Sequence, residues 1–160
     1  MEIRTIKQKN KKIREQLLDI VYKAKAGCLA SSLSTVEILS VLFYKILNLN
    51  KDNYNSCNRN FFVMSKGHGA LALYVILADI GIYNKKYLDT FCLNGAALGG
   101  HIERNEILPM EISTGSLGHG LSIATGIALA QKINGWNNKV YCMISDGELN
   151  EGSTWEPIMF

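Results

Sequence analysis

The chain has 160 residues, of which 48% are hydrophobic, 19% are charged and two are prolines. This composition excludes a disordered or low-complexity chain, and the length suits one domain with a buried core. Much of the net charge of +3 comes from a basic run near the N-terminus, "RTIKQKNKKIREQ", which lacks interleaved aromatic residues and is typical of a solvated helix face, not of a nucleic-acid site.

The first third of the chain predicts two helices. A stripe of apolar residues at helical spacing comes first, and Gly27 is suited to end that helix. The stripe consists of Ile13, Leu17, Ile20, Val21 and Ala24. The next stretch, "SLSTVEILSVLFYKIL", is apolar on almost every side, so we expect a buried helix. Ser34 and Glu37 have the spacing of a capping box at its start.

Short strands and further helices follow. "FFVMS" predicts a buried strand, "KGHG" a tight loop and "ALALYVILADIG" another buried helix. A small helix is expected around "KKYLDTF", and then a long glycine-bearing loop over 94–114.

The last third repeats the pattern. "GSLGHGLSIATGIALAQKI" turns from loop into helix, and "KVYCMIS" predicts an apolar strand. Ser153 and Glu156 have the spacing of a second capping box, at the start of a last helix.

Strands that alternate with buried helices predict an α/β fold, with a parallel sheet covered by helices on both faces. Ligands in such folds bind beyond the carboxyl ends of the strands. The loops "SKGHG" and "SDGELNEG" follow the two strands, and the helix start at "TGSLGHG" is a third candidate wall. The chain stops within an apolar helix start, "WEPIMF", so we expect the fold to be incomplete at the C-terminus.

Asp146 and Gly147 directly follow the second predicted strand. An aspartate in this position is suited to cap the next helix or turn. This is the more common role, and the second interpretation is that its carboxylate holds Mg²⁺ or Ca²⁺ whose other ligands are phosphate oxygens, while the glycine lets the backbone approach a diphosphate. The residues alone leave both interpretations open.

The glycines of "TGSLGHG" also allow two interpretations. They serve close helix–strand packing, or they expose backbone N–H groups at a helix N-terminus to an anion. Their spacing does not match the GxGxxG dinucleotide-binding pattern.

All three histidines, His68, His101 and His119, lie in or beside glycine-rich loops. Loop histidines are often ordinary surface residues, but histidine is also the side chain best suited to proton transfer near neutral pH. No pair has metal-ligand spacing, which argues against zinc.

Three further acids, Glu148, Glu151 and Glu156, surround the second loop. Acids at a helix start are favoured by the helix dipole. If Glu151 or Glu156 is buried beside another carboxylate, its pKa rises and it can share a proton.

These blocks and their order resemble the N-terminal, diphosphate-binding part of a transketolase, of the type divided into two polypeptides. The resemblance runs from about Ile13 to Phe160. It depends on "KAKAG", "SSLSTVEILSVLFY", "FVMSKGHGALALY", "GGHIE", "STGSLGHGLSIATGIALA" and "SDGELNEGSTWE". It implies a thiamine-diphosphate enzyme of carbohydrate (pentose phosphate) metabolism that transfers a two-carbon ketol unit between sugar phosphates.

By this resemblance, Asp146 matches the metal ligand for Mg²⁺ or Ca²⁺, and Gly147 matches a glycine that contacts the diphosphate. His68 matches a histidine beside the diphosphate. The loop that lines the diphosphate and the thiazolium is matched by Gly115, Ser116 and Leu117.

The resemblance also assigns residues to catalysis. His101 matches a histidine that faces the substrate. Glu151 and Glu156 match acids at the dimer interface that are proposed to link the two cofactors.

The chain departs from the family pattern at two positions. Cys28, in "GCLAS", stands where the family usually has a substrate-side histidine, often in His-Pro-Gly. A thiol cannot replace an imidazolium as a hydrogen-bond donor, so this departure bears on the usual activity or the usual substrate. Ser145 replaces the first glycine of Gly-Asp-Gly, a milder change.

The resemblance makes residues 1–160 the N-terminal part of a diphosphate-binding domain. The asparagine that completes the metal site, and the pyrimidine-binding domain, would lie beyond this chain. We therefore expect it to be inactive alone and to work as a homodimer or heterotetramer with a C-terminal-section partner. The alternatives are another thiamine-diphosphate carboligase, similar to deoxyxylulose-phosphate synthase, and a non-catalytic subunit or decayed fragment.

The four cysteines, Cys28, Cys57, Cys92 and Cys142, are scattered and form no CxxC pair. We expect free thiols in a reducing cytoplasm. No apolar run is long enough to cross a bilayer, so we expect a cytoplasmic protein that binds neither a membrane nor nucleic acid.

Overall fold

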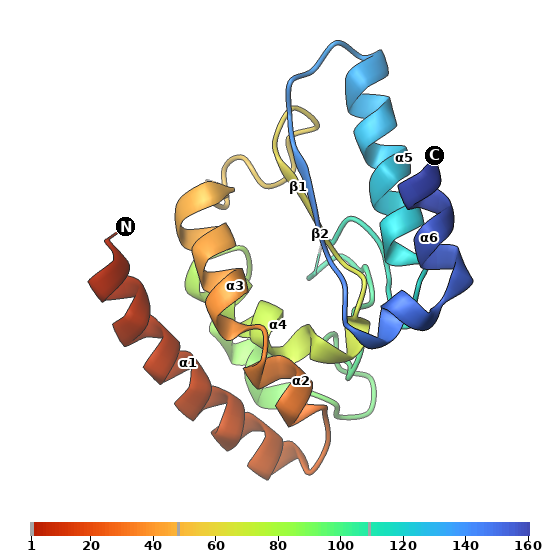
Figure 1. The fold of residues 1–160 in the computed structure, drawn as a ribbon. Helices are drawn as coiled ribbons and strands as arrows, with labels where there is room; N and C mark the ends of the chain where they lie inside the picture. The colour runs from red at the N-terminus through yellow and green to blue at the C-terminus, as the bar shows by residue number, and fades with distance from the viewer. Residues whose placement is uncertain (1, 48, 109) are drawn as a thin grey trace.

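The computed structural model describes residues 2–47, 49–108 and 110–160. Two parallel strands, β1 (Phe61–Met64) and β2 (Val140–Met143), lie side by side between two groups of helices (Figure 1). Phe61 is paired with Val140 and Met64 with Met143. The predicted parallel sheet with helices on both faces is therefore confirmed.

One face of the sheet is covered by the N-terminal helices. These are α1 (Ile3–Ala24), α2 (Leu29–Leu33), α3 (Val36–Val41) with the π-helical turn η1 (Leu42–Ile46), and α4 (Ala70–Asp79). α4 is the centre of the core, because every residue from Ala70 to Ala78 is buried. The ring of Phe43 in η1 packs edge-on against Phe62 of β1, with centroids 5.1 Å apart, which joins this layer to the sheet.

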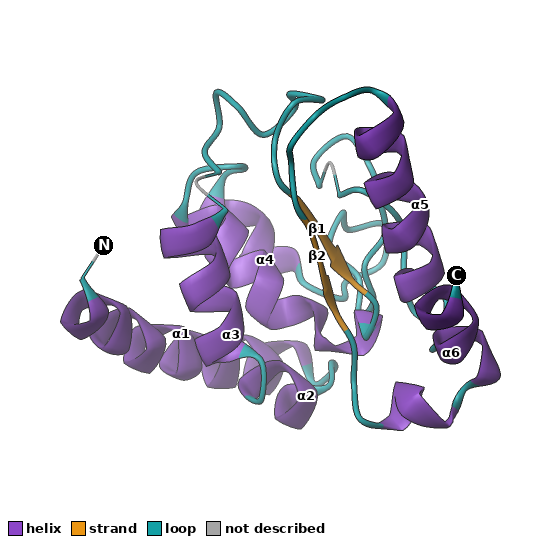
Figure 2. Cartoon of the chain, turned by 45° about the horizontal axis from the view of Figure 1, so that its top comes forward, coloured by secondary structure: helices purple, strands orange, loops and turns teal. Residues whose placement is uncertain are grey.

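The C-terminal helices cover the other face. α5 (Gly120–Ile133) packs on both strands, and α6 (Gly152–Met159) packs on α5 (Figure 2). Short 3₁₀ turns complete the fold: η2 (Gly67–Gly69), η3 (Lys85–Thr90) and η4 (Gly147–Asn150). The long loop expected over 94–114 has neither helix nor strand in its described part, and residue 109 lies outside the described residues.

The two predicted capping boxes are wrong. Ser34 lies at the end of α2 and donates to the carbonyl of Ser31, while the Glu37 carboxylate pairs with Arg14 at 2.6 Å. Ser153 already lies inside α6, whose N-cap is Glu151 without a side-chain cap. In the first case a long-range ion pair has replaced the local hydrogen bond that the spacing favours.

Two other predictions for the first third need correction. The opening helix ends at Ala24, because Lys25 and not Gly27 takes the left-handed cap, with φ of 52° and its N–H donating to Val21. The second helix divides into three short segments and is not buried on every side, since Ile38 is 56% exposed.

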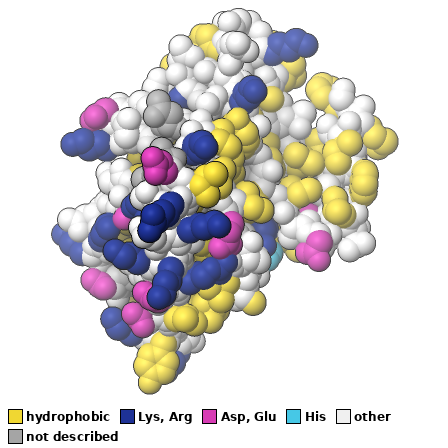
Figure 3. Space-filling model, turned by 60° about the vertical axis from the view of Figure 1, so that its left-hand side comes forward, with side chains coloured by type: hydrophobic (Ala, Val, Ile, Leu, Met, Phe, Trp, Pro, Cys, Tyr) yellow, Lys and Arg dark blue, Asp and Glu magenta, His cyan; other side chains and the backbone are white. Residues whose placement is uncertain are grey.

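Most of the basic residues near the N-terminus are exposed on α1, as expected for a solvated face, but Lys9 and Arg14 are half-buried and pair with Asp79 and Glu37. Figure 3 shows Lys and Arg side chains mixed with Asp and Glu on this side of the molecule. Within the described residues, no helix is both long and apolar enough to cross a membrane.

Candidate functional site at the carboxyl ends of the strands

The loops that follow β1 and β2 lie together at one edge of the sheet. The N–H of Ser65 donates to the carbonyl of Met143 at 2.9 Å, which continues the strand pairing by one residue. The two loops predicted to form the site, 65–69 and 145–152, therefore start side by side, as the parallel arrangement requires.

Glu148 connects these two loops to the third. Its side chain is fully buried, with 0% exposure. Its carboxylate accepts hydrogen bonds from the Ser65 hydroxyl, from the N–H of Gly118 at 2.9 Å and from the N–H of Ser145 at 2.8 Å. A buried carboxylate needs such donors, because an unpaired charge away from water is very unfavourable. The ends of both strands and the start of α5 thus meet at one side chain.

Close backbone packing holds the loop before α5 against both strand ends. A Cβ at Gly120 would lie 2.5 Å from Cβ of Ser65. Gly118 has φ of +82°, and a Cβ there would lie 2.7 Å from Cβ of Glu151. Of the two interpretations of these glycines, close packing therefore describes Gly118 and Gly120.

Gly115 has a different surrounding, because it lies against a histidine. A Cβ at Gly115 would be 3.2 Å from Cδ2 of His101. These residues, with Ser116 and His119, line a hollow of about 340 Å³ that opens at the start of α5. The hydroxyl of Tyr74 in α4 donates to the His101 carbonyl at 2.8 Å and so ties this loop to the core. Leu117, the next residue of the loop, is half-buried.

His68 is half-buried in η2 and lies within electrostatic reach of His101. Burial lowers the pKa of His68, and the positive charges of Lys66 and His101 lower it further, against a smaller opposite effect of Glu148. The imidazole is therefore mainly neutral at pH 7. Lys66, which the sequence reasoning missed, adds a cation beside it, and the ammonium of Lys66 also lies 3.4 Å from the Ser34 hydroxyl.

Thr114 supplies a polar atom suited to a ligand. Its hydroxyl oxygen is buried and has no hydrogen-bond partner among the described residues. It lies 2.8 Å from the position of a Cβ on Gly67, so the loop before α5 touches the loop after β1. An unpartnered buried hydroxyl next to Gly115 fits a site that receives a hydrogen-bond acceptor such as a phosphate oxygen.

Asp146 is exposed, and its carboxylate has no hydrogen bond or ion pair in the part of the chain that the structure describes. No group of three His, Cys, Asp or Glu able to hold a metal is found among the described residues. A metal at Asp146 would need its remaining ligands from phosphate oxygens, backbone carbonyls or residues outside the described ranges. Beside it, a Cβ on Gly147 would meet only the Ser145 hydroxyl, at 3.9 Å, so this backbone is open to an approaching group.

The other predicted site residues lie at the rim. Glu151 and Glu156 are both exposed in this chain, whereas Glu148 is fully buried. Cys28 is exposed at the N-cap of α2, and α2 packs against η2, which carries His68. The thiol thus lies on an element adjacent to the site.

Nothing in the local sequence indicates that Glu148 is buried. An acid two residues after Asp146 is equally suited to a solvated helix start. Only the folding of three distant loops around it removes it from water. The unpartnered hydroxyl of Thr114 likewise depends on tertiary packing. Lys66, in contrast, could have been singled out from the sequence, because it lies in the predicted site loop "SKGHG".

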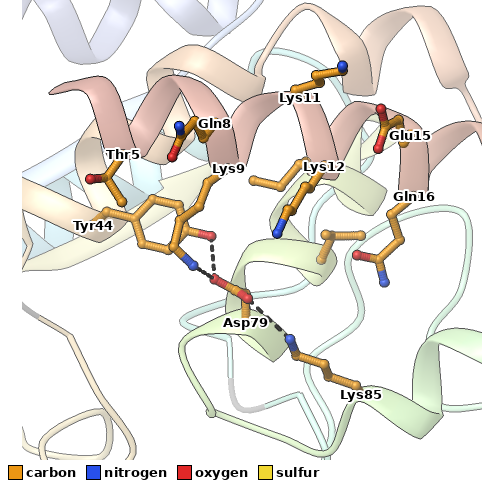
Figure 4. A pocket seen from close by; sticks show the side chains of 12 residues that line it. Thr5, Gln8, Lys9, Lys11, Lys12, Glu15, Gln16, Tyr44, Asp79 and Lys85 are labelled. Carbon is orange, nitrogen blue, oxygen red and sulfur yellow. Dashed lines mark hydrogen bonds and ion pairs between the residues drawn. The ribbon is translucent and has the colours of Figure 1, made fainter. Parts of the chain in front are cut away.

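A hollow of about 770 Å³, larger than the one at the start of α5, lies elsewhere, between α1 and the end of α4 (Figure 4). Asp79 sits at its centre and pairs with Lys9 at 2.5 Å and with Lys85 at 3.1 Å. The Tyr44 hydroxyl also donates to Asp79 at 2.9 Å. Burial would raise the pKa of Asp79, but these donors together hold it below its usual value. The central carboxylate is thus already satisfied by the protein, so size alone does not make this hollow the site.

Comparison with known proteins agrees with the geometry. Residues 5–160 match the family described as transketolase, thiamine diphosphate binding domain. The chain belongs to this transketolase family. An apulose-4-phosphate transketolase subunit of Phocaeicola vulgatus is 40% identical over 159 residues, which are 99% of this chain and 56% of that protein. The 6-deoxy-6-sulfo-D-fructose transketolase subunit SqwG of Clostridium sp. (strain MSTE9) is 37% identical over 148 residues, 92% of this chain and 54% of that protein.

Solved transketolase structures have the same fold. Transketolase from Leishmania mexicana superposes with a TM-score of 0.87 at 30% identity, over 96% of this chain and 24% of that chain. The transketolase-family chain therefore corresponds to the N-terminal section, and it spans somewhat more than half the length of the two transketolase subunits that it matches.

Proposed function

We propose that this chain is the diphosphate-binding section of a divided transketolase, which transfers a two-carbon ketol unit between sugar phosphates together with a C-terminal-section partner. The observation that carries the proposal is the meeting of three loops, 65–69, 114–120 and 145–152, at the carboxyl ends of two parallel strands. The family match and the names of the related transketolase subunits support it.

The chain's own residues would hold the cofactor's diphosphate and its metal. Asp146 would bind Mg²⁺ or Ca²⁺, and Gly147 would let the backbone approach the diphosphate. The Gly115, Ser116 and Leu117 turn would line the diphosphate and thiazolium, and His68 would lie beside them. When bound, thiamine diphosphate supplies a ylid that stabilises a carbanion.

The remaining predicted residues would act on the substrate side and at an interface. His101 lines the hollow and is suited to hold or release a proton of a sugar hydroxyl. Glu151 is exposed at the N-cap of α6 and Glu156 is exposed on the helix itself, where a second subunit would reach them. Exposed apolar side chains nearby, Trp155 and Ile158, support such a contact surface.

The assembly would be a homodimer of this section or a heterotetramer with the partner, which would contribute the pyrimidine-binding domain. In this proposal, residues 1–160 form the N-terminal part of the diphosphate-binding domain. The four cysteines are free thiols, which suits a reducing compartment and supports a cytoplasmic location.

The relatives' names support an anionic substrate. One name contains a phosphate and the other a sulfo group. We therefore place the substrates of this protein among sugar phosphates or related anionic ketoses.

Ketol transfer by the assembled complex tests the proposal. With thiamine diphosphate, Mg²⁺, a ketose phosphate and an aldose phosphate, we expect mass spectrometry to show products that differ by two carbons. Asp146→Asn should lower kcat/KM by about 100-fold or more, because groups that support a metal are worth 10- to 100-fold even when they do not contact it. Asp89→Asn, at an exposed aspartate of η3, is the matched control and should retain activity.

Cys28 favours one alternative, a non-catalytic subunit, which the same assay distinguishes. Gain of transfer in Cys28→His would show a working site with altered specificity. A complex that binds cofactor but transfers nothing with any sugar phosphate tested, with or without this substitution, would contradict the proposed activity.

A further inference from the structure

We propose that Glu148 is a positioning residue of the cofactor site: its buried carboxylate fixes the Gly115 turn and Asp146 relative to the end of β1. The inference depends on the proposed function, because it assigns Glu148 a task at the diphosphate site. Glu148 need not touch the cofactor. It would act through the loops that it holds.

The two carboxylate oxygens are divided between different loops. Oε1 accepts from the Ser65 hydroxyl and from the N–H of Gly118, so it joins the end of β1 to the loop before α5. Oε2 accepts from the N–H of Ser145 at 2.8 Å, at the end of β2. The Ser65 hydroxyl oxygen in turn accepts from the N–H of Gly120, at 3.1 Å. One side chain therefore sets the spacing of three segments.

All the donors to this carboxylate are neutral groups. Hydrogen bonds to an ionised carboxylate are roughly twice as strong as those between neutral groups, and the N–H groups at the start of α5 add the positive end of the helix dipole. The Ser145 hydroxyl also donates to Oε2, at 3.4 Å. A neutral side chain of the same size cannot accept bonds at both ends of the group, because only one of its two terminal atoms is an acceptor.

The main chain of Glu148 is anchored as well. Its carbonyl accepts from the Thr154 hydroxyl of α6 at 2.6 Å and from the N–H of Glu151 at 3.1 Å. Its own N–H lies 3.3 Å from the Ser145 hydroxyl. The acid is thus held at both ends, so the carboxylate is a fixed point to which the loops are attached.

Asp146 depends on this fixed point. Its carboxylate has no partner within the described ranges, so no side-chain contact of its own holds it in place. Its position follows from the backbone between Ser145 and Glu148. Gly115 lies three residues before Gly118 and depends on the same carboxylate through the other oxygen. Loss of one acceptor oxygen would therefore loosen Asp146 and the Gly115 turn together.

The test is Glu148→Gln in the complex with the C-terminal-section partner. Thiamine diphosphate with Mg²⁺ is titrated by calorimetry, and ketol transfer is measured over a range of cofactor concentrations. We expect the Kd for the cofactor to rise tenfold or more, while kcat at saturating cofactor stays within threefold of the unsubstituted complex. A residue that only stabilised the fold would not produce this split.

Glu111→Gln is the matched control. Glu111 is also a buried carboxylate, with 8% side-chain exposure; it pairs with Arg59 at 2.8 Å and accepts from the N–H of Phe62. Its side chain lies at the amino end of β1, and its partners Arg59 and Phe62 belong to none of the three loops. We expect this variant to lose thermal stability but to keep the cofactor Kd within twofold.

Ser65→Ala is a second variant, for the case that Glu148→Gln does not assemble. It removes one donor to the carboxylate and the acceptor of Gly120 without changing the charge, and it should raise the cofactor Kd threefold or more. An unchanged Kd in whichever variant assembles overturns the inference. If the unsubstituted complex binds cofactor in that experiment, the proposed function stands; if it binds none, the proposed function fails first.

Discussion

At the scale of single residues, the lowered pKa of His68 bears most directly on the binding of a diphosphate. Its pKa is lowered by burial and by the charges of Lys66 and His101, so it is mainly uncharged at neutral pH. A bound diphosphate would bring negative charge close to it and favour the imidazolium. His68 is thus suited to take up a proton when the anion binds.

This proton uptake is a testable prediction. The pKa of His68 lies below its usual 6.5 in the free protein and should rise in the complex with cofactor. Between the two values, binding takes up a proton, so affinity should increase as the pH falls through that window. Calorimetry of the assembled complex in two buffers of different ionisation enthalpy measures the uptake.

The diphosphate titrates in the same range, so the comparison with His68→Asn is decisive. This variant should take up measurably less proton than the unsubstituted protein at pH 6. His119→Asn, at an exposed histidine of the hollow, should not change the uptake. Equal uptake in all three proteins would remove His68 from the diphosphate site.

The sequence could predict which residue types form the candidate site, but not how far each side chain is buried. Asp146 and His68 follow strands and glycines, and that order is visible in the chain. The burial of Glu148 depends on Ser65 and Gly118, which are 83 and 30 residues away. No local pattern encodes contacts at such separations.

At the scale of elements, strands and long helices were predictable and their ends were not. β1, β2, α4 and α5 were expected from apolar runs of the right length and lie where expected. The first capping box failed because Glu37 meets Arg14, a residue of another helix, and the second failed because α6 begins one residue before Ser153. Local spacing favours a capping hydrogen bond, but such a bond is worth only about 1 kcal/mol, so a tertiary ion pair can outweigh it.

The contact between the loop before α5 and the start of α6 gives a prediction at this scale. Gly118→Ala should destabilise the protein, because the new Cβ would lie 2.7 Å from Cβ of Glu151 in a left-handed conformation with φ of +82°. We expect the free energy of unfolding to fall by about 2 kcal/mol beyond the cost of the conformation itself. Denaturant unfolding measures it.

Gly135→Ala is its matched control. Gly135 also has positive φ, +69°, but a Cβ there would meet nothing within 4 Å. The difference between the two variants isolates the packing contribution. Equal losses of stability would show that the close approach at Gly118 does not matter.

At the scale of the whole molecule, the candidate site lies at an edge and not in an enclosed cavity. His101, Gly115 and His119 line an open hollow, while Asp146 stands exposed on the neighbouring loop. The order of the sequence blocks was sufficient to predict this arrangement, because parallel strands place their following loops at the same edge. The surface that a partner would cover was not predictable, since the chain's own packing does not define it.

The central claim is that this chain supplies the diphosphate half of a shared thiamine-diphosphate site. Calorimetric titration of thiamine diphosphate with Mg²⁺, into the chain alone and into its complex with the C-terminal-section partner, tests it most directly. We predict saturable binding by the complex and an affinity about 100-fold lower, or undetectable, for the chain alone, because half of the contacts are then missing. Equally tight binding by the chain alone, or no binding by the complex, would contradict the claim.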